Sequence, residues 1–324
     1  TLSTSTYVIS GSTWSGTARL SGLADSVSVQ VYDQFGRVSA DTRIINYYGT
    51  PTVSLGRPMN NHDTSLQTIV ISGTVTNAKT GDSINVYVNG TLNTSTYVIS
   101  GSTWSGTARL SGLADSVSVY VTDQFGTAAG DTRIINYYGT PTMTLGKPMN
   151  DHDTSLQTIV ITGTVTNAKP GDSINIYTNG TLNTSTYVIS GSTWSGTAQL
   201  SGIADSVSVQ LYDQFGRVSA DTRIINYYGT PTASITTPAT NSDTSLSTIL
   251  ISGVSTNVKA GNQIKIFVNG ALKSDSVVLA GLVWYSTGSL SGIGDSISVQ
   301  VTDQWSRTAQ DTRVVNYYGT PTVT

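Results

Sequence analysis

Apolar and polar residues alternate along most of the chain with a period of two, which is typical of half-buried β-strands. In the segment 116–123, Val117, Val119 and Val121 occupy every second position, and polar residues or tyrosine stand between them. The segment 67–77 alternates in the same way. No stretch of ten residues has the period of a helix, so the pattern predicts an all-β chain.

Turn residues divide this alternation into short segments within residues 51–140. Asn89-Gly90 is a strong β-turn signal, and Asp123 and Gly126 stand at the first and last positions of another turn. The alternation does not decide whether Ile134 or its neighbour faces the core. Seven short strands predict an immunoglobulin-like sandwich of two antiparallel sheets. We expect the strands at 51–55, 67–77, 83–89, 97–100, 105–110, 116–123 and 132–138.

The whole pattern returns every 90 residues, without insertion or deletion. The segment that begins TLSTSTYVIS at residue 1 recurs at residues 91 and 181, and in diverged form at residue 271. A unit of this length can bury its own core, whereas solenoid units of about 20–45 residues cannot fold alone. We therefore predict tandem sandwich domains of about 90 residues.

The motif NYYGTPT marks the domain boundaries, because Gly-Thr-Pro ends one strand and forces an extended entry into the next. We expect strands before residue 1 in a longer array, or strands from a neighbouring subunit, to complete the first domain. The predicted domains are 1–50 (the C-terminal part of a repeat), 51–140, 141–230, 231–320 (a divergent repeat, with Trp305) and 321–324 (the start of the next).

Composition narrows the function. The net charge of −3 and the 11% of charged residues provide no electrostatic surface for nucleic acid or anionic membranes. The apolar stretches are too short to insert into a membrane. Cysteine and glutamate are absent, no G-x-S-x-G motif occurs, and the aspartates fall at turns and strand ends, where they cap the backbone. We therefore predict that the chain is not an enzyme.

Two segments of the repeat suggest a family. The segments SGTVTNAKTGDSINVYVNG at 72–90 and DTRIINY at 131–137 resemble bacterial immunoglobulin-like (Big-type) repeats of large surface proteins and adhesins. They also resemble the sandwich modules of secreted glycosidases. The resemblance implies an extracellular protein, at the cell surface or secreted.

Aspartates near the ends of the repeats are candidate calcium ligands, because many arrays of the resembling adhesins are stiffened by calcium at their junctions. Counting strands up and down places Asp63 and Asp115 near Asp172 and Lys169 of the next repeat. Calcium takes six to eight oxygen ligands, and Lys169 argues against a strongly anionic cage. We therefore expect no cofactor, with calcium at this junction as the alternative.

Aromatic residues hold fixed places in every repeat. Trp104 either fills the core or offers a platform for sugar rings, and a sandwich of this size favours the core. Tyr137 and Tyr138 lie at a boundary, where we expect one to pack inward and the other to brace the next domain. These three residues are the candidate binding residues.

Smaller motifs have simpler interpretations. Asp131 and Arg133 predict a turn cap with a surface ion pair, worth at most about 1 kcal/mol. Asn89 and Asn93 each begin an N-glycosylation pattern, repeated at 179 and 183, although the Asn-Gly turn explains the first without a glycan.

Near-identical domains joined by short linkers predict a structural spacer, stalk or filament segment of a long cell-surface protein. Its partners would be adjoining repeats or neighbouring copies of the same chain. The alternative is an adhesin that binds surface glycans or receptors weakly at each repeat and gains strength from their number.

Overall fold

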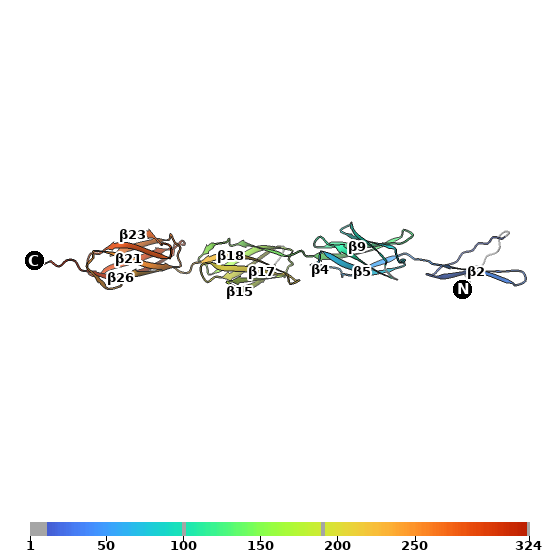
Figure 1. Ribbon diagram of the computed structural model, residues 1–324, viewed down its shortest axis with the longest axis horizontal. Helices are drawn as coiled ribbons and strands as arrows, with labels where there is room; N and C mark the ends of the chain where they lie inside the picture. Colours follow the sequence, from blue (N-terminus) through green and yellow to red (C-terminus); the bar gives the residue numbers. More distant parts are fainter. Residues whose placement is uncertain (1–11, 99–101, 189–191, 323–324) are drawn as a thin grey trace. The chain divides into compact units, whose positions relative to one another are not determined.

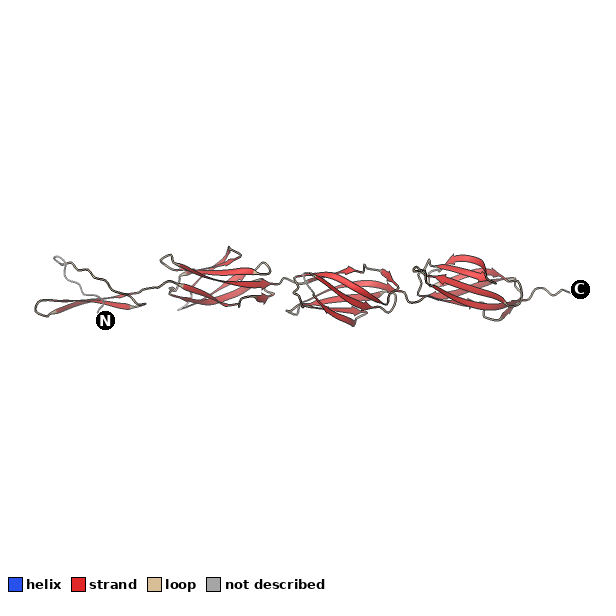
Figure 2. Ribbon diagram, turned by 180° about the vertical axis from the view of Figure 1, so that it is seen from behind, coloured by secondary structure: helices blue, strands red, loops and turns tan. Residues whose placement is uncertain are grey.

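The computed structural model describes residues 12–98, 102–188 and 192–322, and every regular element in these ranges is a β-strand (Figure 2). The predicted all-β, immunoglobulin-like fold is confirmed. The chain forms two compact units, Thr1–Thr140 and Pro141–Thr324, which we describe separately.

Residues 51–140 form two sheets (Figure 1). One sheet has three strands in the order β3-β5-β8, and the other has five in the order β4-β10-β9-β6-β7. The strands are β3 (Thr52–Arg57), β4 (His62–Thr64), β5 (Thr68–Thr76), β6 (Ser83–Val88), β7 (Thr91–Tyr97), β8 (Thr103–Arg109), β9 (Asp115–Thr122) and β10 (Ala128–Tyr137).

Trp104 lies at the centre of the core between these sheets, with 1% of its surface exposed. It is paired in register with Gly73 on the neighbouring strand. A Cβ atom on Gly73 would overlap the carbonyl oxygen of Ser54 and lie 2.9 Å from Trp104 Nε1, so only glycine fits there. Ile135 is fully buried, which settles that it and not Ile134 faces the core.

Two strands differ from the sequence prediction. In place of a strand that begins at residue 97, the structure has β7, which ends there and directly follows the turn, because Asn89 and Gly90 both adopt positive φ and close a tight turn. Residues 99 and 100 of the expected strand lie outside the described residues. The sequence of β7 is polar on both faces, so it lacks the alternation of a half-buried strand. The short strand β4 was not predicted, and it pairs in parallel with β10.

Asp131 and Arg133 form the predicted ion pair, with 3.5 Å between Arg133 Nη2 and Asp131 Oδ2. Both side chains are half-buried, however, and they also connect the two sheets, which the sequence interpretation did not include. The backbone N–H of Leu55 donates to Asp131 Oδ2 at 2.8 Å, and Arg133 Nη2 donates to the Leu55 carbonyl oxygen at 2.9 Å. A bulge in β3 between Leu55 and Arg57 interrupts its pairing with β5 at this point. The pair on β10 therefore clamps β3 of the opposite sheet.

The unit Pro141–Thr324 contains two further sandwiches with the same strand orders. The first consists of β11 (Thr142–Lys147), β12 (His152–Thr154), β13 (Thr158–Thr166), β14 (Ser173–Thr178), β15 (Thr181–Tyr187), β16 (Thr193–Gln199), β17 (Asp205–Tyr212) and β18 (Val218–Tyr227). The second consists of β19 (Thr232–Thr237), β20 (Ser242–Thr244), β21 (Thr248–Thr256), β22 (Gln263–Val268), β23 (Ala271–Val277), β24 (Val283–Ser289), β25 (Asp295–Thr302) and β26 (Thr308–Tyr317).

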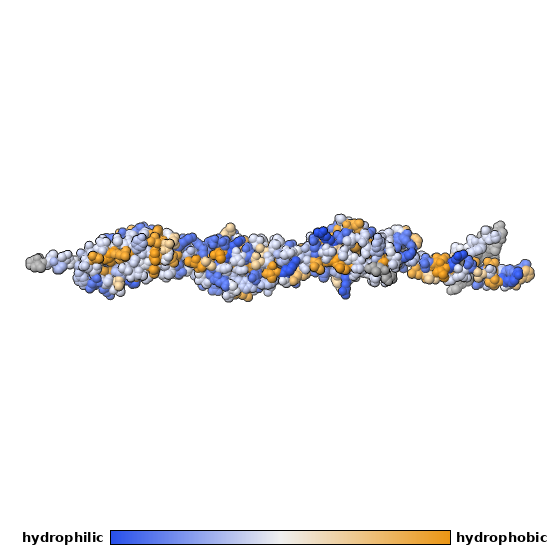
Figure 3. Space-filling model, viewed as in Figure 1, coloured by the Kyte–Doolittle hydropathy of each residue, from blue (hydrophilic) through white to orange (hydrophobic). Residues whose placement is uncertain are grey.

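The described part of residues 1–50 contains one two-stranded sheet of β1 (Asp25–Tyr32) and β2 (Val38–Ile45). Its apolar side chains reach the surface, as Figure 3 shows in orange. Ile45 is 40% exposed, whereas its counterpart Ile135 is fully buried. This segment therefore displays the side chains that form the core of the other repeats.

Candidate junction between repeats

The linker Tyr228–Thr230, within the unit Pro141–Thr324, is bonded through all three of its carbonyl groups. Arg307 Nη2 donates to the carbonyl oxygens of Tyr228 at 3.1 Å and Gly229 at 2.9 Å. Asn257 Nδ2 donates to the carbonyl oxygen of Thr230 at 2.8 Å. Both donors belong to the following repeat, so the linker is fixed to the domain that it enters.

Arg307 is itself held in place. Its Nε donates to Asp303 at 2.7 Å, and its guanidinium carbon lies 5.2 Å from the centre of the Trp305 ring. Trp305 also contacts Tyr228, with ring centres 5.7 Å apart. Tyr228 is 5% exposed, whereas Tyr318, its counterpart one repeat later, is 49% exposed. The following repeat therefore supplies the surface that buries Tyr228.

An ion pair joins the same two repeats. Lys259 Nζ lies 2.8 Å from Asp153 Oδ2, and Asn226 Nδ2 donates to the other oxygen of Asp153. Burial would raise the pKa of Asp153, but the hydrogen bonds from Lys259 and Asn226 hold it below its usual value. Burial and the charge of Asp153 raise the pKa of Tyr228. Charges at this junction are thus paired by side chains of the protein.

Asp63 and Asp172, two of the predicted calcium ligands, accept hydrogen bonds within their own repeats. Asn136 Nδ2 donates to Asp63 at 2.9 Å, and the backbone N–H of Lys169 donates to Asp172 at 2.7 Å. One repeat after Asp172 the chain has Asn262, which carries no charge. Within the described ranges, no cluster of three or more histidine or acidic side chains could hold a metal. Calcium at this junction stays the alternative to the expectation of no cofactor.

Asp115, the third predicted ligand, is buried in a turn. Its carboxylate accepts hydrogen bonds from Ser111 N and Oγ, from the N–H of Gly112 and from Asn89 Nδ2. The same network surrounds Asp295 in the last repeat. Burial would raise the pKa of Asp295, but the bonds from the turn and the Asn side chain lower it to about 2. These aspartates are therefore ionised and saturated with donors.

The candidate binding aromatics divide between core and boundary. Burial of Trp104 leaves no ring face for a sugar, so this residue belongs to the core and not to a binding surface. Tyr137 packs against the core, and Tyr138 is 8% exposed. In the second unit their counterparts have the two roles expected for this pair. Tyr227 packs against the core, and Tyr228 contacts the next repeat.

Sequence reasoning missed the bonding role of Arg307. A signal was present, because position 307 corresponds to arginine at 37 and 217 but to threonine at 127. No helix capable of crossing a membrane occurs among the described residues.

No protein-family model matches the chain, and no curated protein matches it significantly. A structure of a 1.5-MDa bacterial ice-binding adhesin, reported for its retention on the host cell surface, is 22% identical, with a TM-score of 0.29, over 78% of this chain and 91% of that one. A Ca²⁺-stabilized adhesin that helps an Antarctic bacterium reach out and bind ice is 20% identical, with a TM-score of 0.32, and the match covers 91% of this chain and 81% of the adhesin structure. The I-band fragment I67–I69 of titin is 9% identical, with a TM-score of 0.52, and the match covers 84% of this chain and 99% of the titin fragment. The similarity to titin shows the immunoglobulin-like fold.

Proposed function

We propose that the chain is a structural spacer segment, built from domains of about 90 residues with boundaries at 51, 141 and 231, in a long extracellular protein. The observation that carries this proposal is the junction, where all three linker carbonyls are bonded by the following repeat. A linker held in this way limits hinge motion, and a spacer must resist hinge motion to hold its far end away from a surface.

The surroundings of the junction support a non-catalytic role. The charged side chains described there pair with each other or cap turns, which leaves no poised acid, base or nucleophile. The resemblance to Big-type repeats supports a place at the cell surface, with adjoining repeats or other copies of the chain as partners.

The test measures the stiffness of this junction. The Arg307→Thr variant reproduces the residue found at Thr127 and should broaden the distance distribution between nitroxide labels at Thr197→Cys and Thr287→Cys. The chain has no cysteine, so these labels are unique. Arg37→Thr is the matched control, because Arg37 bonds Asp33 within its own repeat. An equally narrow distribution in the Arg307 variant would contradict the proposal.

A second candidate function is multivalent adhesion to neutral glycans, favoured by an uncharged aromatic face on the five-stranded sheets of the repeats 51–140 and 141–230. Tyr87 and Tyr120 meet edge to face with ring centres 5.6 Å apart, and Tyr97 and Tyr187 are each 60% exposed. Binding of the full chain to a glycan array should fall in the Tyr87→Ser/Tyr120→Ser variant. It should persist in Val70→Ser, which alters the exposed face of the other sheet.

A further inference from the structure

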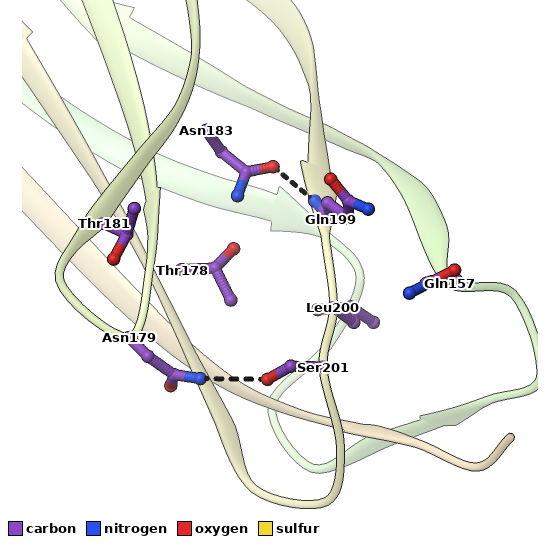
Figure 4. Close-up of a pocket in the computed structure, with 8 residues that line it drawn as sticks. All are labelled: Gln157, Thr178, Asn179, Thr181, Asn183, Gln199, Leu200 and Ser201. Carbon is purple, nitrogen blue, oxygen red and sulfur yellow. Dashed lines mark hydrogen bonds between the residues drawn. The ribbon is translucent and has the colours of Figure 1, made fainter.

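A polar pocket of about 440 Å³ opens in the repeat 141–230, at the edge where its two sheets meet (Figure 4). Thr178 ends β14, Asn183 lies on β15 and Gln199 ends β16, while Gln157 precedes β13. None of the eight residues that line the pocket is charged. Its volume lies in the range of small-molecule sites, about 300–1,000 Å³.

One side of the pocket is rigid. Asn179 Nδ2 donates to Asp205 at 2.7 Å and to Ser201 Oγ at 3.3 Å, and Asn179 Oδ1 accepts the N–H of Ser206. Ser201 Oγ in turn donates to Asp205. Because both polar atoms of the Asn179 side chain are engaged, this first glycosylation pattern is part of the scaffold.

The floor of the pocket holds a buried hydroxyl group. Thr178 is 6% exposed, and its Oγ1 has no hydrogen-bond partner among the residues that the structure describes. The same position is Val88 in the preceding repeat and Val268 in the following one. A buried hydroxyl without a partner is unfavourable where valine of the same shape would fit. The choice of threonine in this repeat alone therefore points to a partner that enters from outside.

Asn183 directs a donor into the pocket. Its Oδ1 accepts the backbone N–H of Gln199, which fixes the orientation of the amide and turns Nδ2 toward Thr178, as Figure 4 shows. The side-chain amides of Gln157 and Gln199 line the same pocket. The groups left for a ligand are thus the Thr178 hydroxyl, the Asn183 Nδ2 donor and the two glutamine amides, which together offer both donors and acceptors without charge.

We propose that this pocket binds one unit of a neutral sugar, a hexopyranose with several adjacent hydroxyl groups. Hydroxyl groups that both donate and accept are the natural partners of amide and threonine side chains. The site is peculiar to the repeat 141–230, because the equivalents of Gln199 are Arg109 and Ser289, and that of Asn183 in the last repeat is Lys273. This binding role is separate from the spacer function, which rests on the junction.

The test titrates the full ¹⁵N-labelled chain with methyl β-D-glucopyranoside, methyl β-D-galactopyranoside and methyl α-D-mannopyranoside, and follows the side-chain amides of Asn183 and Gln199 by NMR. We expect saturable shifts with at least one glycoside and a Kd on the order of millimolar. Thr178→Val should weaken binding at least about tenfold and still fold, because valine occupies this position in both neighbouring repeats.

The preceding repeat provides a gain-of-function test. Val88→Thr with Arg109→Gln makes its pocket identical to that of 141–230 in all eight lining positions. We expect a second set of shifting amides, centred on Asn93, and two bound sugars per chain. The proposal is overturned if no glycoside gives saturable shifts, if Thr178→Val binds as tightly as the unchanged chain, or if glycerol binds as well as the sugars.

Discussion

Tyr120 and Gly130 are matched to each other across two neighbouring strands. A Cβ atom on Gly130 would lie 2.6 Å from the Tyr120 ring, so the ring occupies the space that a side chain would need. Other repeats have the pairs Gln30 with Ala40 and Gln210 with Ala220 at the same register. The ring of Tyr120 therefore requires glycine at position 130.

This match predicts a specific coupling. Gly130→Ala should destabilise the repeat 51–140 by about 1 kcal/mol, because the ring must leave its edge-on contact with Tyr87. Tyr120→Gln combined with Gly130→Ala should restore stability, because that pair occurs naturally elsewhere in the chain. Hydrogen exchange of β9 peptides, whose sequence is unique to this repeat, measures both. Simple additivity in the double variant would contradict the match.

Asp295 should make the last repeat sensitive to acid. Its pKa of about 2 in the folded state lies below the ordinary value of 3.8, so its carboxylate contributes stability above pH 4 that is lost as the pH falls toward 2. The contribution is about 2 kcal/mol. Asp295→Asn should therefore lower the stability of this repeat at pH 7. It should also make the loss of stability between pH 4 and pH 2 smaller than in the unchanged chain.

Hydrogen exchange in β25 between pH 2 and pH 7, with urea added in steps, follows this dependence. Asp275→Asn, an exposed site in the same repeat, is the control and should behave like the unchanged chain. If the Asp295 variant has the same acid sensitivity as the control, the hydrogen bonds to Asp295 do not contribute the expected stability.

The burial of a residue could be predicted from the sequence where it follows from the alternation along a single strand. The alternation identified Val117, Val119 and Val121 as core, and all three are buried. The clamp of Asp131 and Arg133 could not be predicted, because its acceptor and donor are backbone groups about 76 residues away in the other sheet. Pattern reasoning compares side chains along the chain and contains no information about such distant backbone partners.

Among the elements, β18 makes the equivalent pair of hydrogen bonds to the β11 backbone, so the contribution of this clamp to stability can be tested there. Arg223 Nη2 donates to the Leu145 carbonyl oxygen at 2.8 Å, and Asp221 accepts the Leu145 N–H at 2.9 Å. Arg223→Ala should destabilise the repeat 141–230 by about 1–3 kcal/mol, because a half-buried carbonyl group loses its partner. Faster hydrogen exchange in β11 is the expected signature.

Arg43 gives the matched control for this variant. It occupies the same position in β2 but is 79% exposed and pairs with Asp41 at 3.3 Å. Arg43→Ala should leave stability unchanged, as for most exposed ion pairs. If both alanine variants have the same small effect, the clamp contributes no more than a surface pair.

At the scale of the whole molecule, we predict that calcium is not needed for stability. Asp153 is already paired with Lys259, and the Asp115 and Asp295 carboxylates accept several hydrogen bonds each. A chelator should therefore leave the thermal unfolding midpoint of the full chain unchanged. A ligand that binds only the folded state raises this midpoint, so an increase on adding Ca²⁺ would establish the alternative.

The repeat and its fold could be predicted from the sequence because the period and the alternation are both local. The strand count also placed Asp63 and Lys169 at facing ends of adjoining repeats, and the equivalent residues in the second unit, Asp153 and Lys259, do form an ion pair. The pocket on 141–230 could not be predicted, because Thr178 replaces valine without disturbing the alternation.

The hydrogen-bond acceptors in the linker Tyr228–Thr230 are main-chain carbonyl oxygens, so they do not depend on which side chains the linker carries. Any repeat that ends in Tyr-Gly-Thr offers the same three carbonyl groups, whatever its other residues are. Whether the joint closes around them depends on the arginine and asparagine of the repeat that follows. These hydrogen bonds need no matching side chain upstream, so a duplicated or exchanged downstream repeat brings its own donors to the linker. The Asp153–Lys259 ion pair and the contact between Tyr228 and Trp305, in contrast, require side chains from both repeats.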